Sequence, residues 1–544
     1  MTASDWSRRQ WLGATAGAGV LALTGCRPSP AEATASTPDA HWVGASHERG
    51  HRLRGAARER QQLAPADVQR RAPVLIVGAG VAGLSAARAF AARGVDGVQL
   101  LELEDHAGGN SRGHSIGSID CPLGAHYLPV PPPHSPAVEV SEWLHEIGLL
   151  QQHLGQSVPA ERHLCFAPQE RLFIDGAWVE GLLPPVEPGA AMQAQVRLFA
   201  AEVAAAQRTG FALPSIRAPW TAAHQALDAV TFAAWLDRRG LVDAQLRWYL
   251  DYCCRDDFGA DATVVSAWAG LQYFASRHGF HAPGDEDTER EPVWTWPEGN
   301  AWLVQRLAAP FAARTHTGRT VLRVTEGRHA VTVLAWDEAT SRLEQWSAGT
   351  VVLALPLFVA ARLVESPPTA LREIASQLSY APWLVANVAL AAPLLHRSGA
   401  PPAWDNVAYG DSALGYVDAM HQSLRTAPGP TVLSFYRALP TAERGALLQD
   451  SAATWAQRVL ADAAVVHPDL PTAAGRIDLM RWGHGMAIPV PGVRGSAAIA
   501  ALRAQRGRLR FAHADLCGTS VFEESFTIGA LCAQQSTPPR GIGA

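Results

Sequence analysis

Three glycines and one acid near the start of the chain have the types and spacing needed to hold a phosphate and a sugar. Gly78, Gly80 and Gly83 end an apolar run and open an Ala-rich segment within residues 74–87. The first glycine allows a tight turn, the second lets a pyrophosphate approach the backbone, and the third lets a helix pack closely on a strand. Glu102 ends a second apolar run 24 residues after Gly78, which suits a carboxylate that binds ribose hydroxyls. This chemistry is that of a dinucleotide-binding site.

The elements that must position these residues are a strand, a turn, a helix and a second strand. The helix N-terminus after the glycine turn faces the phosphate, where its free N–H groups and its dipole favour negative charge. This order of elements predicts an α/β fold with a Rossmann-type nucleotide-binding domain. A second, mixed α+β domain is expected because 544 residues exceed what one nucleotide-binding domain needs.

The composition is that of a globular protein and argues against several function classes. Hydrophobic residues make up 48% of the chain and charged residues 17%. The net charge of −5 offers no basic surface for nucleic acid, and no apolar run reaches the roughly 18–20 residues that a membrane span needs. All 45 basic residues are arginines, so no lysine can act as a base or form a Schiff base.

The segment around Glu102 resembles the extended FAD fingerprint of the flavin-containing amine oxidase superfamily, which also holds phytoene-desaturase-like enzymes. In that fingerprint a Gly-Gly pair, here Gly108-Gly109, follows the ribose acid and lies near the FAD phosphates. Most members have Arg directly after the pair, whereas this chain has Asn110, with Arg112 two residues later. The resemblance therefore implies FAD as the cofactor and Arg112 as the nearby cation.

Further segments that resemble the superfamily follow in order over about residues 74–535. They are residues 120–127, 296–300, 320–324, 351–356 and 510–515. The resemblance places Val321 against the adenine and the acid Asp515 on the flavin side of the cofactor. It also implies that the FAD-binding domain is assembled from three separated stretches of the chain.

These motifs divide the chain into FAD-binding and substrate-binding parts. Apolar spacing near i, i+3, i+4, i+7 predicts helices over residues 188–280, within the substrate domain. The expected FAD-binding parts are 71–150, 291–364 and 481–535. The expected substrate-binding parts are 151–290 and 365–480. A signal (1–26), a tether and N-terminal arm (27–70) and a tail (536–544) complete the division.

Resemblance to amine oxidases directs attention to the residues over the flavin. Those enzymes place a lysine, through a water, near the flavin N5, and alignment by eye puts Asn387 at that position here. They also bracket the amine with two aromatic rings. The matching segment supplies Trp482 as one wall and His484 as a neutral base or water holder. His126, beside Tyr127, is a further candidate, although either histidine could instead be a hydrogen-bonded core residue.

One motif suggests different chemistry. Residues 47–51 read His-Glu-Arg-Gly-His and match HExxH, in which two histidines bind zinc and the glutamate acts as a base. That chemistry needs a rigid helix, but this segment has Gly50 near its middle and no apolar periodicity around it. We therefore interpret it as a chance match and expect no metal site.

The N-terminus resembles an export address. Arg8 and Arg9 precede a short apolar segment that ends with Leu23-Thr24-Gly25-Cys26. The arginine pair resembles a twin-arginine signal, whose route exports folded proteins with their cofactor already bound. The four-residue segment resembles a bacterial lipobox, in which Cys26 becomes the lipidated first residue. A periplasmic lipoprotein held to the membrane only by its acyl chains is expected; the alternative is a charged start beside a short buried helix.

The leading interpretation is an exported FAD-dependent oxidoreductase that oxidises an amine or polyamine by hydride transfer to flavin. Oxygen or a quinone would accept the electrons. Non-covalent FAD is expected because residues 481–492, where some amine oxidases attach the flavin, contain no cysteine. The missing lysine keeps open a desaturase or isomerase that acts on a lipophilic substrate with a quinone acceptor. A third possibility is a catalytically inactive flavoprotein that serves as an assembly partner in the cell envelope.

Overall fold

The structure is a computed structural model that describes residues 38–52, 65–133, 135–186, 191–277, 279–282, 292–421, 423, 425 and 427–536. The predicted export signal, with Arg8, Arg9 and Cys26, lies outside these residues, and so does part of the predicted tether. No helix in the described ranges is long and apolar enough to cross a membrane.

The first sheet draws its strands from three separated stretches of the chain, as the resemblance implies. Its parallel strands lie in the order β12 (Thr315–His316), β3 (Gln99–Leu101), β2 (Val68–Val77) and β15 (Arg342–Leu353), and β21 (Leu509–Phe511) also pairs with β15. β14 (Val331–Asp337) and β13 (Arg319–Glu326) extend the sheet as antiparallel strands. Because β2 and β3 run parallel, the glycine turn and Glu102 meet at one edge of the sheet.

The second half of β2, residues 74–77, is buried on both faces, which explains why this part of the strand is entirely apolar. Val74 and Ile76 pack in one core cluster, and Leu75 and Val77 pack in another. The first cluster includes residues of α3 (Val81–Ala92), α4 (Val138–Glu146), α10 (Ala301–Ala308) and α17 (Phe522–Gln534). The second includes residues of α11 (Leu357–Leu363), α12 (Thr369–Gln377) and α16 (Ala497–Ala504).

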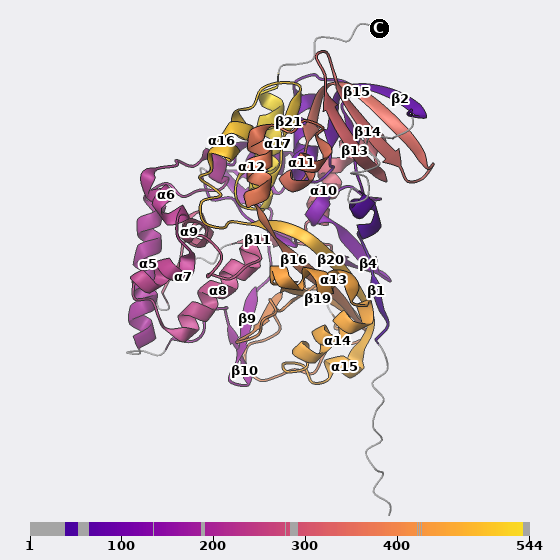
Figure 1. Cartoon of the computed structure of the whole chain (residues 1–544). Coiled ribbons are helices and arrows are strands. Elements are labelled where there is room, and N and C mark those ends of the chain that lie inside the picture. Colours follow the sequence, from indigo (N-terminus) through magenta and orange to yellow (C-terminus); the bar gives the residue numbers. More distant parts are fainter. Residues whose placement is uncertain are drawn as a thin grey trace, which may run out of the picture. The chain divides into compact units, whose positions relative to one another are not determined.

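A second sheet of eight described strands lies in the lower part of the molecule in Figure 1. Its order is β1 (Ala40–Trp42), β20 (Ala474–Ile488), β16 (Ser379–Leu390), β19 (Thr431–Ala438), β18 (Tyr416–Asp418), β17 (Asp405–Ala408), β9 (Glu170–Ile174) and β10 (Ala177–Glu180). β20 is one continuous strand, so the expected domain boundary between residues 480 and 481 falls inside it. The sheet supplies one wall of the site described below.

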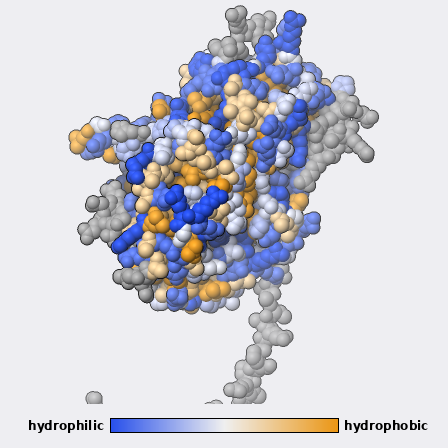
Figure 2. All heavy atoms as spheres, turned by 60° about the vertical axis from the view of Figure 1, so that its left-hand side comes forward, coloured by the Kyte–Doolittle hydropathy of each residue, from blue (hydrophilic) through white to orange (hydrophobic). Residues whose placement is uncertain are grey.

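Helices accompany this sheet in two groups. The first group occupies the region where sequence spacing predicts helices and is magenta at the left of Figure 1: α5 (Ala191–Gln207), α6 (Ala222–Asp228), α7 (Phe232–Arg238), α8 (Ala244–Phe258) and α9 (Ala267–Ala275). The second group is α13 (Arg444–Gln449), α14 (Ala452–Ala463) and α15 (Leu470–Ala473). Figure 2 shows hydrophilic residues over much of the outer face, with hydrophobic side chains scattered among them.

Shorter elements connect these layers. The hairpins and strand pairs are β4 (Gly113–Ile116) with β5 (Ile119–Pro122), β7 (Leu150–His153) with β8 (Gln156–Pro159), and β6 (Tyr127–Pro129) with β11 (Val293–Thr295). The 3₁₀ helices are η1 (Gly109–Ser111), η2 (Glu161–His163), η3 (Ser215–Arg217), η4 (Ala309–Arg314), η5 (Thr441–Glu443) and η6 (Ala514–Leu516).

Candidate functional site

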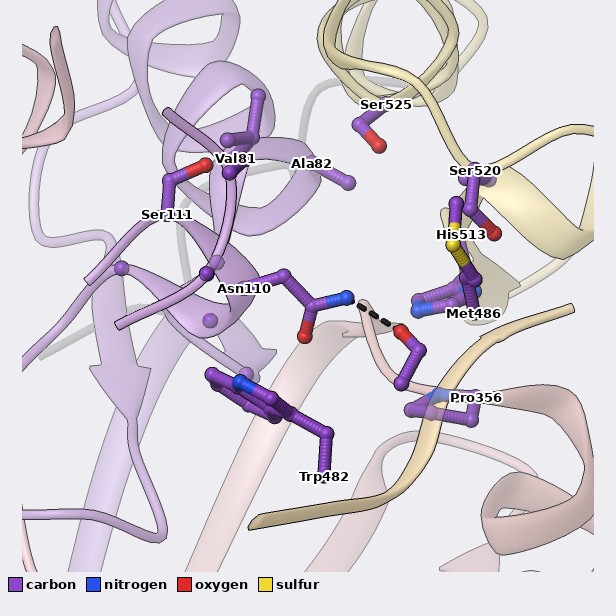
Figure 3. Close-up of a pocket in the computed structure, with 18 of the residues that line it drawn as sticks. Val81, Ala82, Asn110, Ser111, Pro356, Trp482, Met486, His513, Ser520 and Ser525 are labelled. Atoms are coloured by element: carbon purple, nitrogen blue, oxygen red, sulfur yellow. Dashed lines mark hydrogen bonds between the residues drawn. The ribbon is translucent and has the colours of Figure 1, made fainter. Parts of the chain in front are cut away.

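A cavity of about 550 Å³ is lined by residues of both sheets and of the helices around them. One end carries Glu102 and Val321, at the edge of the first sheet. The middle passes the N-termini of α3 and α17, and the other end carries aromatic side chains of the second sheet. Figure 3 shows the middle of the cavity, with Asn110 and Trp482 facing His513 and Met486.

The three glycines of the first turn have different tasks, and the structure shows each of them. Gly78 has a φ of +101°, and a Cβ there would lie 2.3 Å from the Ala354 carbonyl oxygen. A Cβ at Gly83 would lie 1.9 Å from the Gly78 carbonyl oxygen, so Gly83 allows α3 to pack on the turn. Gly80 lines the cavity, and the nearest atom to a Cβ there is Gly109 Cα at 3.6 Å. The absence of a side chain at Gly80 therefore leaves space for a ligand, whereas at Gly78 and Gly83 it avoids a clash with the protein backbone.

The second glycine turn completes a cradle beside the first. Gly108 and Gly109 line the cavity and have φ values of +136° and +55°, which favour glycine. The Gly108 N–H donates to the Ala79 carbonyl oxygen at 2.9 Å, which joins the two turns. Helix α3 starts at this cradle with no side-chain cap and no acid in its first turn. Its N–H groups are therefore available to a pyrophosphate.

Glu102 is held at the end of β3 with its carboxylate at the cavity. It accepts hydrogen bonds from the Ala79 N–H at 2.8 Å and from the Glu104 N–H at 3.0 Å. Burial raises the pKa of Glu102, although both N–H donors and Arg112 oppose that shift. Val321 lines the same end, where β13 has a bulge. Glu102 and Val321 thus line the same cavity, where the sequence places a ribose and an adenine.

Arg112 also lines the cavity, but its guanidinium already donates hydrogen bonds to backbone carbonyls. Nε donates to the Gly109 carbonyl at 3.1 Å and Nη1 donates to the Gly44 carbonyl at 3.0 Å. The guanidinium carbon lies 5.2 Å from the centre of a Trp482 ring. Asn110, which replaces the expected arginine, donates across the cavity to the Gly485 carbonyl (Figure 3). Arg112 therefore fixes the second turn and adds positive charge beside the cradle.

Asp515, which the resemblance places on the flavin side of the cofactor, lies behind the cavity wall. It is fully buried, and its side chain is not among those that line the cavity. Its carboxylate accepts hydrogen bonds from the Tyr380 hydroxyl at 2.5 Å and the Leu357 N–H at 2.9 Å. The 3₁₀ turn η6 directs Asp515 into the protein, while His513 and Ala514 face the cavity. The structure therefore does not bring Asp515 itself to the cavity, because a motif does not show which side chain of a turn points inward.

Three of the four predicted catalytic residues line the cavity, and Asn387 does not. Asn387 is fully buried, donates to the Pro122 carbonyl at 2.9 Å and accepts from the Ser434 hydroxyl at 2.6 Å. β16 instead presents Trp383 and Val385 to the cavity. Alternation along a strand places residues 383, 385 and 387 on one face; Asn387 lies beyond the end of the cavity. The structure therefore does not bring Asn387, the predicted water holder over the flavin, to the cavity.

Trp482 and His484 both lie at the cavity on β20, as predicted. Trp482 Nε1 donates to the Leu123 carbonyl at 2.7 Å, which fixes the plane of the indole ring. The His484 ring centre lies 4.8 Å from that of Phe358 and 6.1 Å from that of Tyr380. Trp482 is therefore a rigid wall, and His484 belongs to an aromatic group at the cavity edge.

His126 lines the aromatic end of the cavity. Its ring stacks on Tyr436 with centres 4.3 Å apart and contacts Tyr127 and Trp404 at 5.2 and 5.5 Å. Burial lowers the pKa of His126 to about 4, and a hydrogen bond with Gly124 only partly opposes this. His126 is therefore neutral near pH 7. We call the three of these rings that line the cavity, His126, Tyr127 and Tyr436, the aromatic box; Trp404 packs beside them and is not among the lining residues.

Sequence reasoning missed a carboxylate pair on α8 that lines the same cavity. Asp257 pairs with Arg277 at 3.0 Å, whereas Asp256 has no hydrogen-bond or ion-pair partner among the described residues. Burial and the neighbouring Asp257 raise the pKa of Asp256 to about 7. The only sequence signal is the adjacent acid pair before Gly259, the C-cap of α8. The contact with the cavity depends on how α8 packs.

The first histidine of the HExxH segment contacts charged side chains on both of its ring nitrogens. His47 Nδ1 lies 2.5 Å from Arg481 Nη2, and because arginine can only donate, this ring nitrogen must accept. Its other nitrogen lies 3.1 Å from the Glu48 carboxylate. In the part of the chain that is described, no group of three or more His, Cys, Asp or Glu residues is placed to hold a metal ion.

The cavity fits FAD. The two glycine turns leave a cradle open, the α3 N-terminus is uncapped, and Glu102 and Val321 stand at one end. No described cysteine lines the cavity. When bound, FAD would lie with its phosphates at the cradle and its flavin toward Trp482 and the aromatic box.

Comparison with known proteins agrees with this geometry. A profile of the family described as flavin containing amine oxidoreductase matches residues 81–535. A search of curated protein sequences finds no significant match.

Several solved structures share the fold. A wild-type putrescine oxidase bound to putrescine is 18% identical, with a TM-score of 0.60, covering 86% of this chain and 99% of that one. Cyclohexylamine oxidase from Brevibacterium oxydans IH-35A is 17% identical, with a TM-score of 0.61 and coverage of 87% and 97%. The CLA-producing fatty acid isomerase from P. acnes is 16% identical, with a TM-score of 0.58 and coverage of 84% and 97%.

At these identities the solved structures show only that the fold is shared. The family profile covers most of the chain, including the α3 helix after the first glycine turn and the C-terminal α17. The chain is an FAD-dependent oxidoreductase with an amine-oxidase-like α/β fold. It belongs to the flavin containing amine oxidoreductase family.

Proposed function

We propose that this oxidoreductase oxidises an amine or polyamine that binds as a cation. The observation that carries the proposal is Asp256, a carboxylate without a hydrogen-bond or ion-pair partner in the described chain, which lines the same cavity as the aromatic box. A lipophilic substrate would cover this partly buried carboxyl group and offer it no hydrogen-bond partner, which is costly. An ammonium group would compensate it through a charge-assisted hydrogen bond.

The aromatic box favours the same class of substrate. The faces of tyrosine and tryptophan rings attract a nearby cation, more so where water is excluded. Tyr436 is held in place because its hydroxyl donates to the Gly124 carbonyl at 3.0 Å. His126 stays neutral and therefore does not repel a cation in the cavity. A box of this kind beside a carboxylate binds an ammonium better than an alkyl chain.

The chain's own residues orient the substrate and exclude water. When bound, FAD would supply the redox chemistry by accepting a hydride from the carbon beside the nitrogen. Trp383 and Val385 form apolar walls, and Trp482 is fixed by its bond to Leu123. Asp256 can hold an ammonium group or take up its proton, because its pKa lies near neutrality. A lysine-bound water has no counterpart, since the chain contains no lysine.

The test is anaerobic reduction of the bound flavin, which is measured as the loss of its visible absorbance. Putrescine or spermidine should reduce the flavin of the wild-type protein. Asp256→Asn should raise the amine concentration needed for half-maximal reduction about tenfold or more, the usual scale for losing a hydrogen bond to a charged group. The matched control is Asp237→Asn, which removes an exposed carboxylate on α7 outside the cavity and should change nothing.

Two outcomes would contradict the proposal. If no amine reduces the flavin but a lipid extract does, the desaturase or isomerase interpretation with a quinone acceptor is correct instead. The apolar walls formed by Trp383 and Val385 are the feature that favours that alternative. If Asp256→Asn and Asp237→Asn behave alike while amines still reduce the flavin, the role given to Asp256 is wrong.

We also propose that the protein is exported through the twin-arginine route and anchored by lipid on Cys26. The support is the sequence alone: the Arg8-Arg9 pair and the segment that ends at Cys26. Replacing both arginines with lysine should leave the FAD-loaded protein in the cytoplasm, and Cys26→Ser should release it from the membrane fraction. Unchanged fractionation of both variants would contradict the proposal.

A further inference from the structure

Residues 38–52 form an N-terminal arm that precedes the first strand of the FAD domain in the sequence. The arm contacts both sheets. The arm precedes the region that the family profile matches, which starts at residue 81. Its strand β1 pairs in parallel with β20, where Ala40 and Trp42 lie opposite Ile477 and Leu479. The guanidinium carbon of Arg481 lies 4.6 Å from the centre of a Trp42 ring. The arm is therefore anchored to the second sheet.

From that anchor the arm continues to the loop that follows Glu102. The Ser46 N–H donates to the Glu104 carboxylate at 3.1 Å. Arg49 Nη1 donates to the Leu103 carbonyl at 3.3 Å and forms an ion pair with Asp105 at 2.8 Å. These three contacts join the arm to consecutive residues directly after the ribose-binding acid.

The arm forms part of the cavity wall at this end. Arg49 and Gly50 both line the cavity, together with Glu102, Glu104 and Val321. The Gly44 carbonyl accepts a hydrogen bond from Arg112, so the arm also supports the second glycine turn. The side chain of Arg49 is 20% exposed, whereas that of Arg52 is 48% exposed. Arg52 pairs with Glu338 and does not line the cavity.

We propose that the N-terminal arm is a wall of the FAD site and that Arg49 binds the adenosine-diphosphate half of the cofactor. A guanidinium beside a pyrophosphate and ribose provides positive charge and N–H donors where the ligand carries negative charge. Asp105 and the Leu103 carbonyl fix the position of that guanidinium before the ligand binds. Cofactor release then requires the arm to leave its place.

The proposal is tested by the rate of FAD release, which is measured without any substrate and is independent of the amine assignment. Arg49→Ala should speed FAD dissociation about tenfold or more, the usual scale for a charged hydrogen bond. Arg52→Ala is the matched control, because it removes an ion-paired arginine from the same arm three residues away. Its dissociation rate should stay within about twofold of the wild type, as expected for an exposed ion pair.

Two results would overturn the assignment of Arg49. The first is an unchanged FAD dissociation rate in Arg49→Ala. The second is an equal acceleration in Arg49→Ala and Arg52→Ala, which would show that any loosening of the arm has the same effect. Arg49→Lys gives a further comparison, because lysine keeps the positive charge and lacks the planar guanidinium group. Its FAD dissociation rate should lie between those of Arg49→Ala and the wild type.

A reciprocal experiment tests the arm as a whole. If the closed arm favours FAD binding, FAD must favour the closed arm by the same free energy. Limited trypsin digestion of the full chain should therefore cut after Arg49 or Arg52 more slowly with FAD bound than after the cofactor has been removed. Equal cleavage rates at these sites in both forms would overturn the proposal, even if the variants folded poorly.

Discussion

The hydroxyl of Tyr380 donates a 2.5 Å hydrogen bond to the carboxylate of Asp515. This bond joins the beginning of β16 to the turn η6 after β21, and so connects the two sheets behind the cavity. Burial alone would raise the pKa of Asp515, but His513, the Tyr380 hydroxyl and the Leu357 N–H outweigh it and lower the pKa. Asp515 is thus an ionised, buried anchor whose neighbours His513 and Ala514 line the cavity.

The first prediction separates this anchoring role from cofactor binding. Tyr380→Phe removes one donor from the buried carboxylate, which should lower the free energy of unfolding by about 1–3 kcal/mol. The loss should appear equally with and without FAD, because the bond does not involve the cofactor. Urea unfolding of both forms measures it. A loss seen only in the FAD-loaded protein would instead place Asp515 at the cofactor.

The same carboxylate has a predictable dependence on pH. Since folding lowers the pKa of Asp515, its stabilising contribution is present above the unfolded value of 3.8 and is lost as the pH falls through the folded value. The difference in the free energy of unfolding between the wild type and Tyr380→Phe should therefore disappear in acid.

The second prediction uses two glycines of one turn that have different surroundings. Gly80→Ala places a methyl group where the nearest protein atom is 3.6 Å away, so the protein should fold while the methyl group obstructs the phosphate cradle. FAD affinity should fall at least tenfold, about the effect of 1.4 kcal/mol. Gly83→Ala places its methyl group 1.9 Å from a backbone oxygen, so it should fail to fold stably. Fluorescence titration with FAD and thermal unfolding measure the two effects, and the reverse pattern would contradict the cradle.

Local motifs predicted which residues of the two glycine turns and of β3 line the cavity, and contacts between distant segments account for what the motifs missed. Gly78, Gly80 and Glu102 lie in one strand–turn–helix–strand unit, so their spacing alone determines how they meet. Asn387 does not reach the cavity because the cavity ends before its position along β16, and the sequence of the strand does not show how far the cavity extends. Asp256 could not be found, because its place at the cavity results from the packing of α8 against segments far away in the chain.

The third prediction concerns Asn387, a buried amide with two hydrogen bonds. Asn387→Ala leaves the Pro122 carbonyl and the Ser434 hydroxyl without their partner. Leaving buried polar groups unsatisfied costs about 1–3 kcal/mol each, so the free energy of unfolding should fall clearly. The rate of flavin reduction in the protein that remains folded should not change, since Asn387 does not line the cavity. A change in rate without a change in stability would restore Asn387 as a residue of the site.

The last prediction follows from the pKa of Asp256, which burial and then Asp257 raise from 3.8 to about 7. Below the unfolded value the group is protonated in both states, so Asp256→Asn should leave stability unchanged there. Between the two values the folded protein holds a proton that the unfolded chain has released, so wild-type stability falls as the pH rises. Above about 7 the folded protein carries a charge on Asp256 that Arg277 and Arg255 compensate only in part, and asparagine avoids that charge. Thermal unfolding of the substrate-free protein should therefore show the variant to be more stable than the wild type in mildly alkaline buffer, and equally stable in acid.

Asp237→Asn, at an exposed carboxylate, should show no such difference between the two conditions. If Asp256→Asn is equally or less stable in alkali, a protein group already compensates Asp256, and its availability to a cationic substrate is disproved.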